Sequence, residues 1–287
     1  MASTQDRLGV IAGAGELPIA IAQAARRGGR AVFVLALEGM ATSGDVAPFP
    51  HAFVSLGQLG KAIKLLKDAG CSEITLAGRV ARPDFTALKL DAKGALALPR
   101  VMAAALRGDD AILRTMLSIF EKEGMRVVGS EEAARSLLAP FGALGQIEPS
   151  EEDLKEVAHA AQVAQALGAL DVGQAAVACR GLVLAVEAAE GTDAMLLRVA
   201  TLPEALRGTP EARKGALVKT LKPGQERRVD LPVIGVKTVE LAAAAGLAGI
   251  AFEGAGALIV DQDAVAKAAD RHRLFVYGFV PQDLRRD

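Results

Sequence analysis

Carboxylates suited to phosphate chemistry occur at three places in the chain. Asp109 and Asp110 are adjacent, and Asp193 lies in the second half. Asp230 directly precedes a Leu-Pro pair. In protein sites that bind phosphate groups, magnesium is held by one or two carboxylates, keeps several waters and binds phosphate oxygens at its remaining positions. These aspartates are therefore candidate Mg²⁺ ligands in a site that hydrolyses a phosphate compound.

A structural role is also open to two of these positions. Asp109 and Asp193 each precede a helical pattern, where a carboxylate can accept backbone hydrogen bonds as an N-cap. Their position alone favours capping. Asp230 differs, because a residue close to a proline favours extended geometry and no helix is predicted before about Thr238. A capping role is therefore harder to assign to Asp230.

A glycine turn near the N-terminus is a candidate phosphate cradle. Gly13-Ala14-Gly15 follows an apolar run and precedes a helical pattern, so the backbone could approach an anion closely. The third glycine of the dinucleotide fingerprint would fall at Pro18, which offers no amide. Glu38 lies near the expected place of a ribose-binding acid, which keeps a nicotinamide site open. A plain tight turn explains the two glycines equally well.

Basic side chains that could balance phosphate charge lie in both halves of the chain. Lys219 ends a predicted strand, and Lys222 follows it in the same stretch as Asp230. Arg79 follows Gly78 at the end of another predicted strand. Most such stretches are solvated loops, but Lys and Arg beside a carboxylate also suit the binding of a diphosphate.

Composition argues against several other classes of protein. The 33 basic residues nearly cancel the 34 acidic ones, and 3% of residues are aromatic, so we expect no nucleic-acid partner. The two cysteines have no metal-site or disulfide spacing and are expected in the core of a cytoplasmic protein. The sequence starts without a secretory signal pattern and contains no apolar run long enough to span a bilayer.

The elements that must position these residues form two different patterns. Apolar runs alternate with helical patterns in the first half, which predicts a parallel sheet covered on both faces. Its ligand crevice is expected at the carboxyl ends of the strands, beside Gly13 and Gly78. The order of elements in the second half does not repeat the first. We therefore predict an α/β protein with a Rossmann-like N-terminal domain over 1–139, a linker over 140–149 and a C-terminal catalytic α/β domain of different topology over 150–287.

Six segments, taken in order, resemble the signatures of one family. The family is the UDP-2,3-diacylglucosamine pyrophosphatases of lipid A biosynthesis, in the form unrelated to the dinuclear metallophosphoesterases that perform the same step. The resemblance extends from about Leu8 to Gly278. Its segments are VIAGAGELP at 10–18, GRVARP at 78–83, GDDAILR at 108–114, AVEAAEGTD at 185–193, LVK at 217–219 with KPGQ at 222–225, and DLPVIG at 230–235.

The resemblance implies a two-domain cytosolic enzyme that uses Mg²⁺ to hydrolyse UDP-2,3-diacylglucosamine to UMP and 2,3-diacylglucosamine 1-phosphate. It places the ligand between the domains and implies that Asp230 is required for catalysis. From charge, we assign Asp193 to catalysis with Asp230, and both to Mg²⁺ with Asp109 and Asp110. The predicted substrate-binding residues are Gly13, Ala14, Gly15, Gly78, Arg79, Thr192, Lys219 and Lys222.

The acyl chains and the partners are less well defined by the sequence. A diacyl substrate predicts an apolar groove, for which residues 88–106 are a candidate, although a core-packing helix interrupted at Pro99 is favoured there. Transient contact with the inner membrane and a homodimer are left open. The alternative functions are an NAD(P)-dependent oxidoreductase and a non-catalytic nucleotide-binding module.

Overall fold

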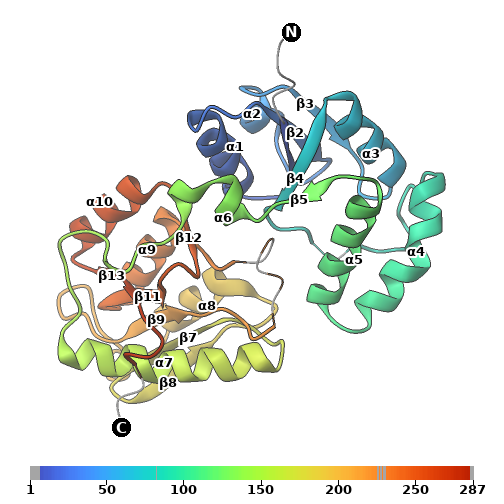
Figure 1. The fold of residues 1–287 in the computed structure, drawn as a ribbon. Coiled ribbons are helices and arrows are strands. Elements are labelled where there is room, and N and C mark those ends of the chain that lie inside the picture. The colour runs from blue at the N-terminus through green and yellow to red at the C-terminus, as the bar shows by residue number, and fades with distance from the viewer. Residues whose placement is uncertain (1–6, 82, 225, 227, 229–230, 285–287) are drawn as a thin grey trace. The chain divides into compact units, whose positions relative to one another are not determined.

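The computed structural model describes residues 7–81, 83–224, 226, 228 and 231–284, and divides into two compact units (Figure 1). The first contains the described residues up to Ser136 together with Glu226 and Arg228. The second contains the other described residues from Leu137 onward.

The first unit is built on a parallel sheet with the strand order β3-β2-β1-β4-β5. Every residue of β2 is buried, as expected for a strand whose sheet is covered on both faces. The predicted Rossmann-like parallel sheet is therefore confirmed. Its strands are β1 (Arg7–Ala12), β2 (Val32–Leu37), β3 (His51–Val54), β4 (Cys71–Ala77) and β5 (Arg126–Val127).

Amphipathic helices cover this sheet. In α3, Leu59, Ile63 and Leu66 recur at helical spacing and pack into the core beside Leu35 of β2. Helix α5 contributes Phe120 to the same cluster. The helices are α1 (Leu17–Arg27), α2 (Ser43–Val46), α3 (Leu59–Asp68), α4 (Ala92–Ala105), α5 (Asp109–Lys122) and α6 (Ser130–Ala133), followed by a 3₁₀ turn at Arg135–Leu137.

Helix α4 differs from the helix favoured by the sequence. It continues through Pro99 without interruption, and Leu96, Met102 and Leu106 are exposed on it or at its end rather than packed into the core. Small residues explain its inner side, because Gly94 and Ala104 are buried and allow close approach to neighbouring elements. The core-packing prediction for this segment is therefore wrong for Leu96, Met102 and Leu106, whereas Leu98 and Val101 are partly buried.

The second unit has a mixed sheet with the strand order β6-β13-β11-β9-β7-β8 and a small parallel pair, β10-β12. Strands β8, β9, β11 and β13 run in one direction, and β6 and β7 run in the other. The predicted α/β domain of different topology is confirmed. Its strands are β6 (Gly142–Ala143), β7 (Ala175–Cys179), β8 (Leu182–Val186), β9 (Ala216–Lys219), β10 (Val233–Ile234), β11 (Gly249–Glu253), β12 (Leu258–Ile259) and β13 (Phe275–Phe279).

Alternate residues of this sheet enter two separate cores. Val177 and Leu217 pack with α8, α9 and α10, whereas Ala176 and Val218 pack with α7 on the other face. Figure 1 shows α7 running along the sheet. The helices are α7 (Glu151–Ala169), α8 (Gly191–Ala200), α9 (Val236–Ala244) and α10 (Gln262–His272).

The segment predicted as a linker, 140–149, lies in the second unit. Gly142–Ala143 forms β6 at the sheet edge, and the Leu144 amide donates to the Val276 carbonyl at 2.7 Å. The proline and glycines of this segment suggested a linker. A two-residue edge strand leaves no periodic apolar pattern in the sequence, so the pattern did not show β6.

Both cysteines are buried, as the sequence predicted. Desolvation raises the pKa of the Cys71 thiol to about 11, although the charge of Arg7 opposes the shift. Burial is also the main reason why the pKa of Cys179 is raised. Thiols of this kind stay protonated near neutral pH and are poor nucleophiles.

Asp91 caps α4 and fixes it to α3. Its carboxylate accepts hydrogen bonds from the Gly94 amide at 2.8 Å and the Lys61 amide at 2.9 Å. Partial burial opposes ionisation, but these and further backbone hydrogen bonds outweigh it and lower the pKa of Asp91. The ionised carboxylate therefore stabilises the folded first unit.

We expect Asp91→Ala to lower the free energy of unfolding of this unit by about 1–2 kcal/mol near pH 7. The difference from the parent chain should be complete above the ordinary aspartate pKa of about 4 and should shrink as acidification protonates the folded carboxylate, because the folded pKa is the lower one. Urea unfolding over a pH series measures both effects. Asp68→Ala, which removes an exposed ion pair with Lys64, should cost at most about 0.5 kcal/mol. Equal effects of the two substitutions would contradict the capping role.

Candidate functional site

A buried polar cluster lies in the second unit. Lys219 ends β9 with 6% of its surface exposed, and Glu187 follows β8 with 7% exposed. Thr192, which is partly exposed, joins them, because its hydroxyl accepts a hydrogen bond from Lys219 Nζ at 3.0 Å and donates one to Glu187 Oε1. Lys219 Nζ also donates to the Val233 carbonyl at 3.2 Å. We call Glu187, Thr192 and Lys219 the buried cluster.

Strand direction explains why these residues meet. Strands β8 and β9 both run antiparallel to β7, so their carboxyl ends lie at the same edge of the sheet. Helix α8 begins at that edge with Gly191, whose φ of 79° favours glycine. Ligands of α/β proteins bind at such edges, and a helix N-terminus attracts anions. The edge therefore combines a lysine ammonium group with the positive end of a helix dipole.

Two further polar groups lie beside the buried cluster. Gln174 directly precedes β7 at this edge, and Thr220 directly follows Lys219. Their side-chain oxygens, Oε1 and Oγ1, are buried and have no hydrogen-bond partner within the described part of the chain. Buried polar atoms usually find a partner in protein or water, so these two atoms are candidates for contact with a ligand.

Asp193 lies next to the buried cluster but is half-exposed. Its carboxylate pairs with Lys237 Nζ at 2.7 Å. Asp193 and Asp109 both lie in the first turns of their helices, where negative charge is favourable, but Glu190 and Gly108 hold the N-cap positions. The capping role that position alone favoured is therefore wrong for both aspartates.

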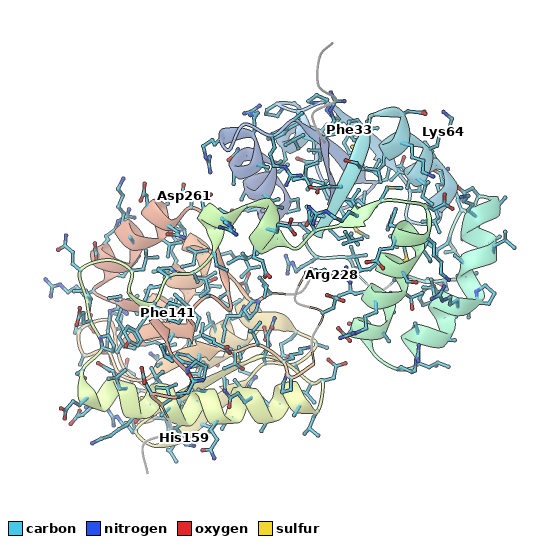
Figure 2. The ribbon with its side chains drawn as sticks, in the orientation of Figure 1. Phe33, Lys64, Phe141, His159, Arg228 and Asp261 are labelled. Carbon is cyan, nitrogen blue, oxygen red and sulfur yellow. The ribbon has the colours of Figure 1, made fainter. Side chains whose placement is uncertain are left out.

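The residues that follow β9 in the sequence belong to different parts of the fold. Lys222 Nζ binds Asp171 at 2.9 Å on the turn after α7. Asp230 lies outside the described residues, so its predicted roles in catalysis and metal binding stay predictions. Its neighbour Arg228 belongs to the first unit, where it pairs with Glu226 at 2.9 Å and with Glu121 of α5 at 2.7 Å (Figure 2).

Asp109 and Asp110 begin α5 in the first unit, whereas Asp193 belongs to the second unit. Asp110 Oδ2 accepts from Arg114 Nε at 2.6 Å, and its Oδ1 accepts from the Glu226 amide at 3.0 Å. Asp110 and Arg114 also line a hollow of about 260 Å³. Its remaining lining residues are Arg100, Arg107, Ala111 and Thr115.

The glycine loops of the first unit meet each other. The amides of Ala14 and Arg79 each donate to the other residue's carbonyl at 2.8 Å. A Cβ at Gly13 would lie 2.6 Å from the Arg79 carbonyl oxygen, and one at Gly78 would lie 2.8 Å from that of Ala14. Close packing of the two loops thus requires these glycines. An anion at this place would instead approach Gly15, which has open space around it, and the first turn of α1.

The described carboxylates do not assemble a metal site in their present arrangement. Among the described residues, no group of three or more His, Cys, Asp or Glu side chains could hold a metal ion. Asp193 and Asp110 each pair with a basic side chain instead. A magnesium site using them would require those ion pairs to open.

Sequence reasoning missed Glu187, Gln174 and Thr220. Glu187 lies inside the segment at 185–193 that was singled out for Asp193, and its signal was a charged residue at the end of an apolar run. Gln174 precedes a strand that the pattern did not reveal.

Within the described ranges, no helix is long and apolar enough to cross a membrane.

Comparisons with known proteins cover nearly the whole chain. Residues 7–137 match the model of the LpxI N-terminal domain, and residues 140–277 match that of the LpxI C-terminal domain. The UDP-2,3-diacylglucosamine pyrophosphatase LpxI of Caulobacter vibrioides is 50% identical over 277 residues, which are 96% of this chain and 99% of that protein.

A solved structure of Thermus thermophilus UDP-glucose 4-epimerase with NAD is also matched, at 14% identity and a TM-score of 0.32, over 97% of this chain and 91% of that one. A likeness this low bears on neither fold nor reaction. The two domain matches and the Caulobacter relative agree with each other, and this chain belongs to the LpxI family.

Proposed function

We propose that this chain hydrolyses the pyrophosphate bond of UDP-2,3-diacylglucosamine, giving UMP and 2,3-diacylglucosamine 1-phosphate in lipid A biosynthesis. The observation that carries the proposal is the 50% identity, over 96% of the chain, to a relative named for this pyrophosphatase activity. An NAD(P)-dependent oxidoreductase and a non-catalytic nucleotide-binding module are not favoured, because that relative is a hydrolase in name and matches both units.

The buried cluster suits the electrostatic demand of this reaction. A phosphoric anhydride carries negative charge that repels an attacking oxygen nucleophile, so its site must neutralise phosphate oxygens. We assign that task to Lys219 and the N-terminus of α8, with Lys222 as a second cation. Glu187 and Thr192 are positioning residues, because their hydrogen bonds hold the Lys219 ammonium group at the sheet edge.

Substrate hydroxyl or amide groups are assigned to Gln174 and Thr220, whose side-chain oxygens are buried without partners within the described structure. We assign the positioning of the attacking water to Asp230, with Asp193 as its predicted helper. A carboxylate can hold a water molecule in line with the phosphorus and accept a proton from it.

Magnesium, a cytoplasmic location and transient contact with the inner membrane belong to the same proposal, and a homodimer stays open. When bound, Mg²⁺ would screen the diphosphate charge. Asp193 and Asp110, two of its predicted ligands, are paired with Lys237 and Arg114.

The direct test is incubation of the full chain with UDP-2,3-diacylglucosamine in detergent, with release of UMP measured by chromatography. We expect UMP in the presence of Mg²⁺, loss of release when EDTA removes the ion, and recovery on adding Mg²⁺ back. Unchanged release in EDTA would refute the metal dependence alone. Substrate binding without any product under either condition would favour the nucleotide-binding module and refute hydrolysis.

Asp230→Ala should reduce UMP release by a factor on the order of 10² or more, because it removes the group assigned to the water. Substrate binding, measured by calorimetry, and the far-ultraviolet circular dichroism spectrum should stay close to those of the parent chain. Asp263→Ala, on the exposed first turn of α10, is the matched control and should retain activity. Near-normal turnover by the Asp230 variant would remove this residue from the mechanism.

Lys219→Met should lower UMP release by roughly 10²-fold, since it removes a cation placed to stabilise phosphate charge. It also leaves Glu187 without its bridged counter-charge, so a lower unfolding temperature is expected. Lys219→Arg keeps the charge and should recover part of the activity, and Lys267→Ala on exposed α10 should change neither property. A folded Lys219→Met protein with full activity would rule out the electrostatic role.

A further inference from the structure

We propose that the exposed face of α4 docks on the surface of an anionic phospholipid bilayer. The helix lies at the right of Figure 1. One set of exposed apolar residues recurs along it at spacings of three and four, as residues on one face of a helix do. These residues are Ala92, Ala95, Leu96, Pro99, Met102, Ala103 and, at the helix end, Leu106.

This face reverses the usual polarity of a surface helix. Helices of globular proteins normally turn polar side chains outward and an apolar stripe toward the core. Here Leu96 is 83% exposed, Leu106 is 90% exposed and Met102 is 46% exposed. The opposite side carries the buried Gly94 and Ala104 and the partly buried Leu98 and Val101. Burial within the first unit therefore does not account for the apolar stripe.

A row of basic residues borders the stripe. Lys93, Arg100 and Arg107 are exposed and are spaced by seven residues, so they lie along one margin of the apolar face. Arg100 and Arg107 also line the hollow between α4 and α5, together with Arg114. The acidic groups near this row include Glu123, which pairs with Lys93, and Asp110, which pairs with Arg114. Asp91 and Asp109 each lie two residues along the chain from a member of the row.

The combination selects one kind of partner. An apolar stripe alone would fit many surfaces, but an adjoining row of cations favours one that offers both hydrocarbon and negative charge. A bilayer with anionic headgroups offers both, with lipid phosphates available to the arginines of the hollow. The stripe is roughly 20 Å long at 1.5 Å per residue, too short to span the hydrocarbon core, so α4 would lie in the interface plane.

The inference rests on the proposed function for its purpose, because a diacylated substrate resides in a bilayer. Its evidence is independent of that function, since it comes from exposure and charge on α4. Docking would bring the chain to its substrate and leave the chemistry unchanged. Binding to vesicles and turnover in detergent therefore test the two proposals separately.

The test uses the full chain with vesicles of phosphatidylcholine alone or mixed with phosphatidylglycerol, and measures co-flotation over a range of salt concentrations. We expect binding to the anionic vesicles only, weakened by salt. Leu96→Gln with Leu106→Gln, and separately Arg100→Gln with Arg107→Gln, should each weaken binding by roughly tenfold or more. The matched controls Leu197→Gln with Leu206→Gln, and Arg27→Gln with Arg271→Gln, replace exposed residues elsewhere and should bind like the parent.

Turnover separates the outcomes. The α4 variants should release UMP normally from substrate in detergent micelles and more slowly from substrate in anionic vesicles. Detergent activity without vesicle binding by the parent chain would overturn the docking proposal and leave the function intact. Vesicle binding through α4 without any UMP release would support the docking proposal and overturn the proposed function. Equal binding by parent and α4 variants, or an oligomer that only the leucine variants dissociate, would also overturn the docking proposal, the latter in favour of a second copy of the chain.

Discussion

The burial of the Lys219 ammonium group constrains the organisation of the second unit. An ammonium group removed from water is costly unless hydrogen-bonding partners and an opposite charge replace the lost solvation. Here the partners are the Thr192 hydroxyl and the Val233 carbonyl, and Glu187 supplies the negative charge through Thr192. They come from the start of α8, from β10 and from the end of β8. One buried charge thus ties three segments to the end of β9.

The same constraint explains how the edge can act on a diphosphate. The charge of a lysine on a solvated loop would occupy many positions, whereas hydrogen bonds to the Thr192 hydroxyl and the Val233 carbonyl hold the Lys219 ammonium group at a defined point. Such preorganisation makes a cation effective toward charge that develops during a reaction. The unpartnered oxygens of Gln174 and Thr220 within the described structure add acceptors beside the cation. Asp193 and Lys237 are more exposed and pair with each other, so their interaction is more readily exchanged for one with a ligand or an ion.

The sequence predicted those features that depend on local patterns. The alternation of apolar runs and helical patterns in the first half predicted the parallel sheet that contains β1, β2 and β4, and the helices between its strands. Features that depend on distant pairing were not accessible in this way. Strands β6 and β10 have two residues each, too few to show a period, and their existence depends on partners far along the chain. Arg228 joins the first unit through ion pairs with Glu121 and Glu226, which no local pattern encodes.

The positions of charged residues in the sequence were also not enough to identify the residues of the site. Grouping Asp109, Asp110 and Asp193 as metal ligands treated every unassigned carboxylate as available, yet Asp110 is engaged by Arg114 and by a backbone amide. Glu187 went unassigned although it is the carboxylate that compensates the buried lysine. Helix α4 shows the same limit for apolar residues. Apolar residues spaced by three and four show that one face of the helix is apolar. Whether that face packs into the core or lies on the surface depends on how the opposite face packs. Gly94 and Ala104 let the backbone of α4 approach its neighbours closely, and Leu96 and Leu106 are left on the outside.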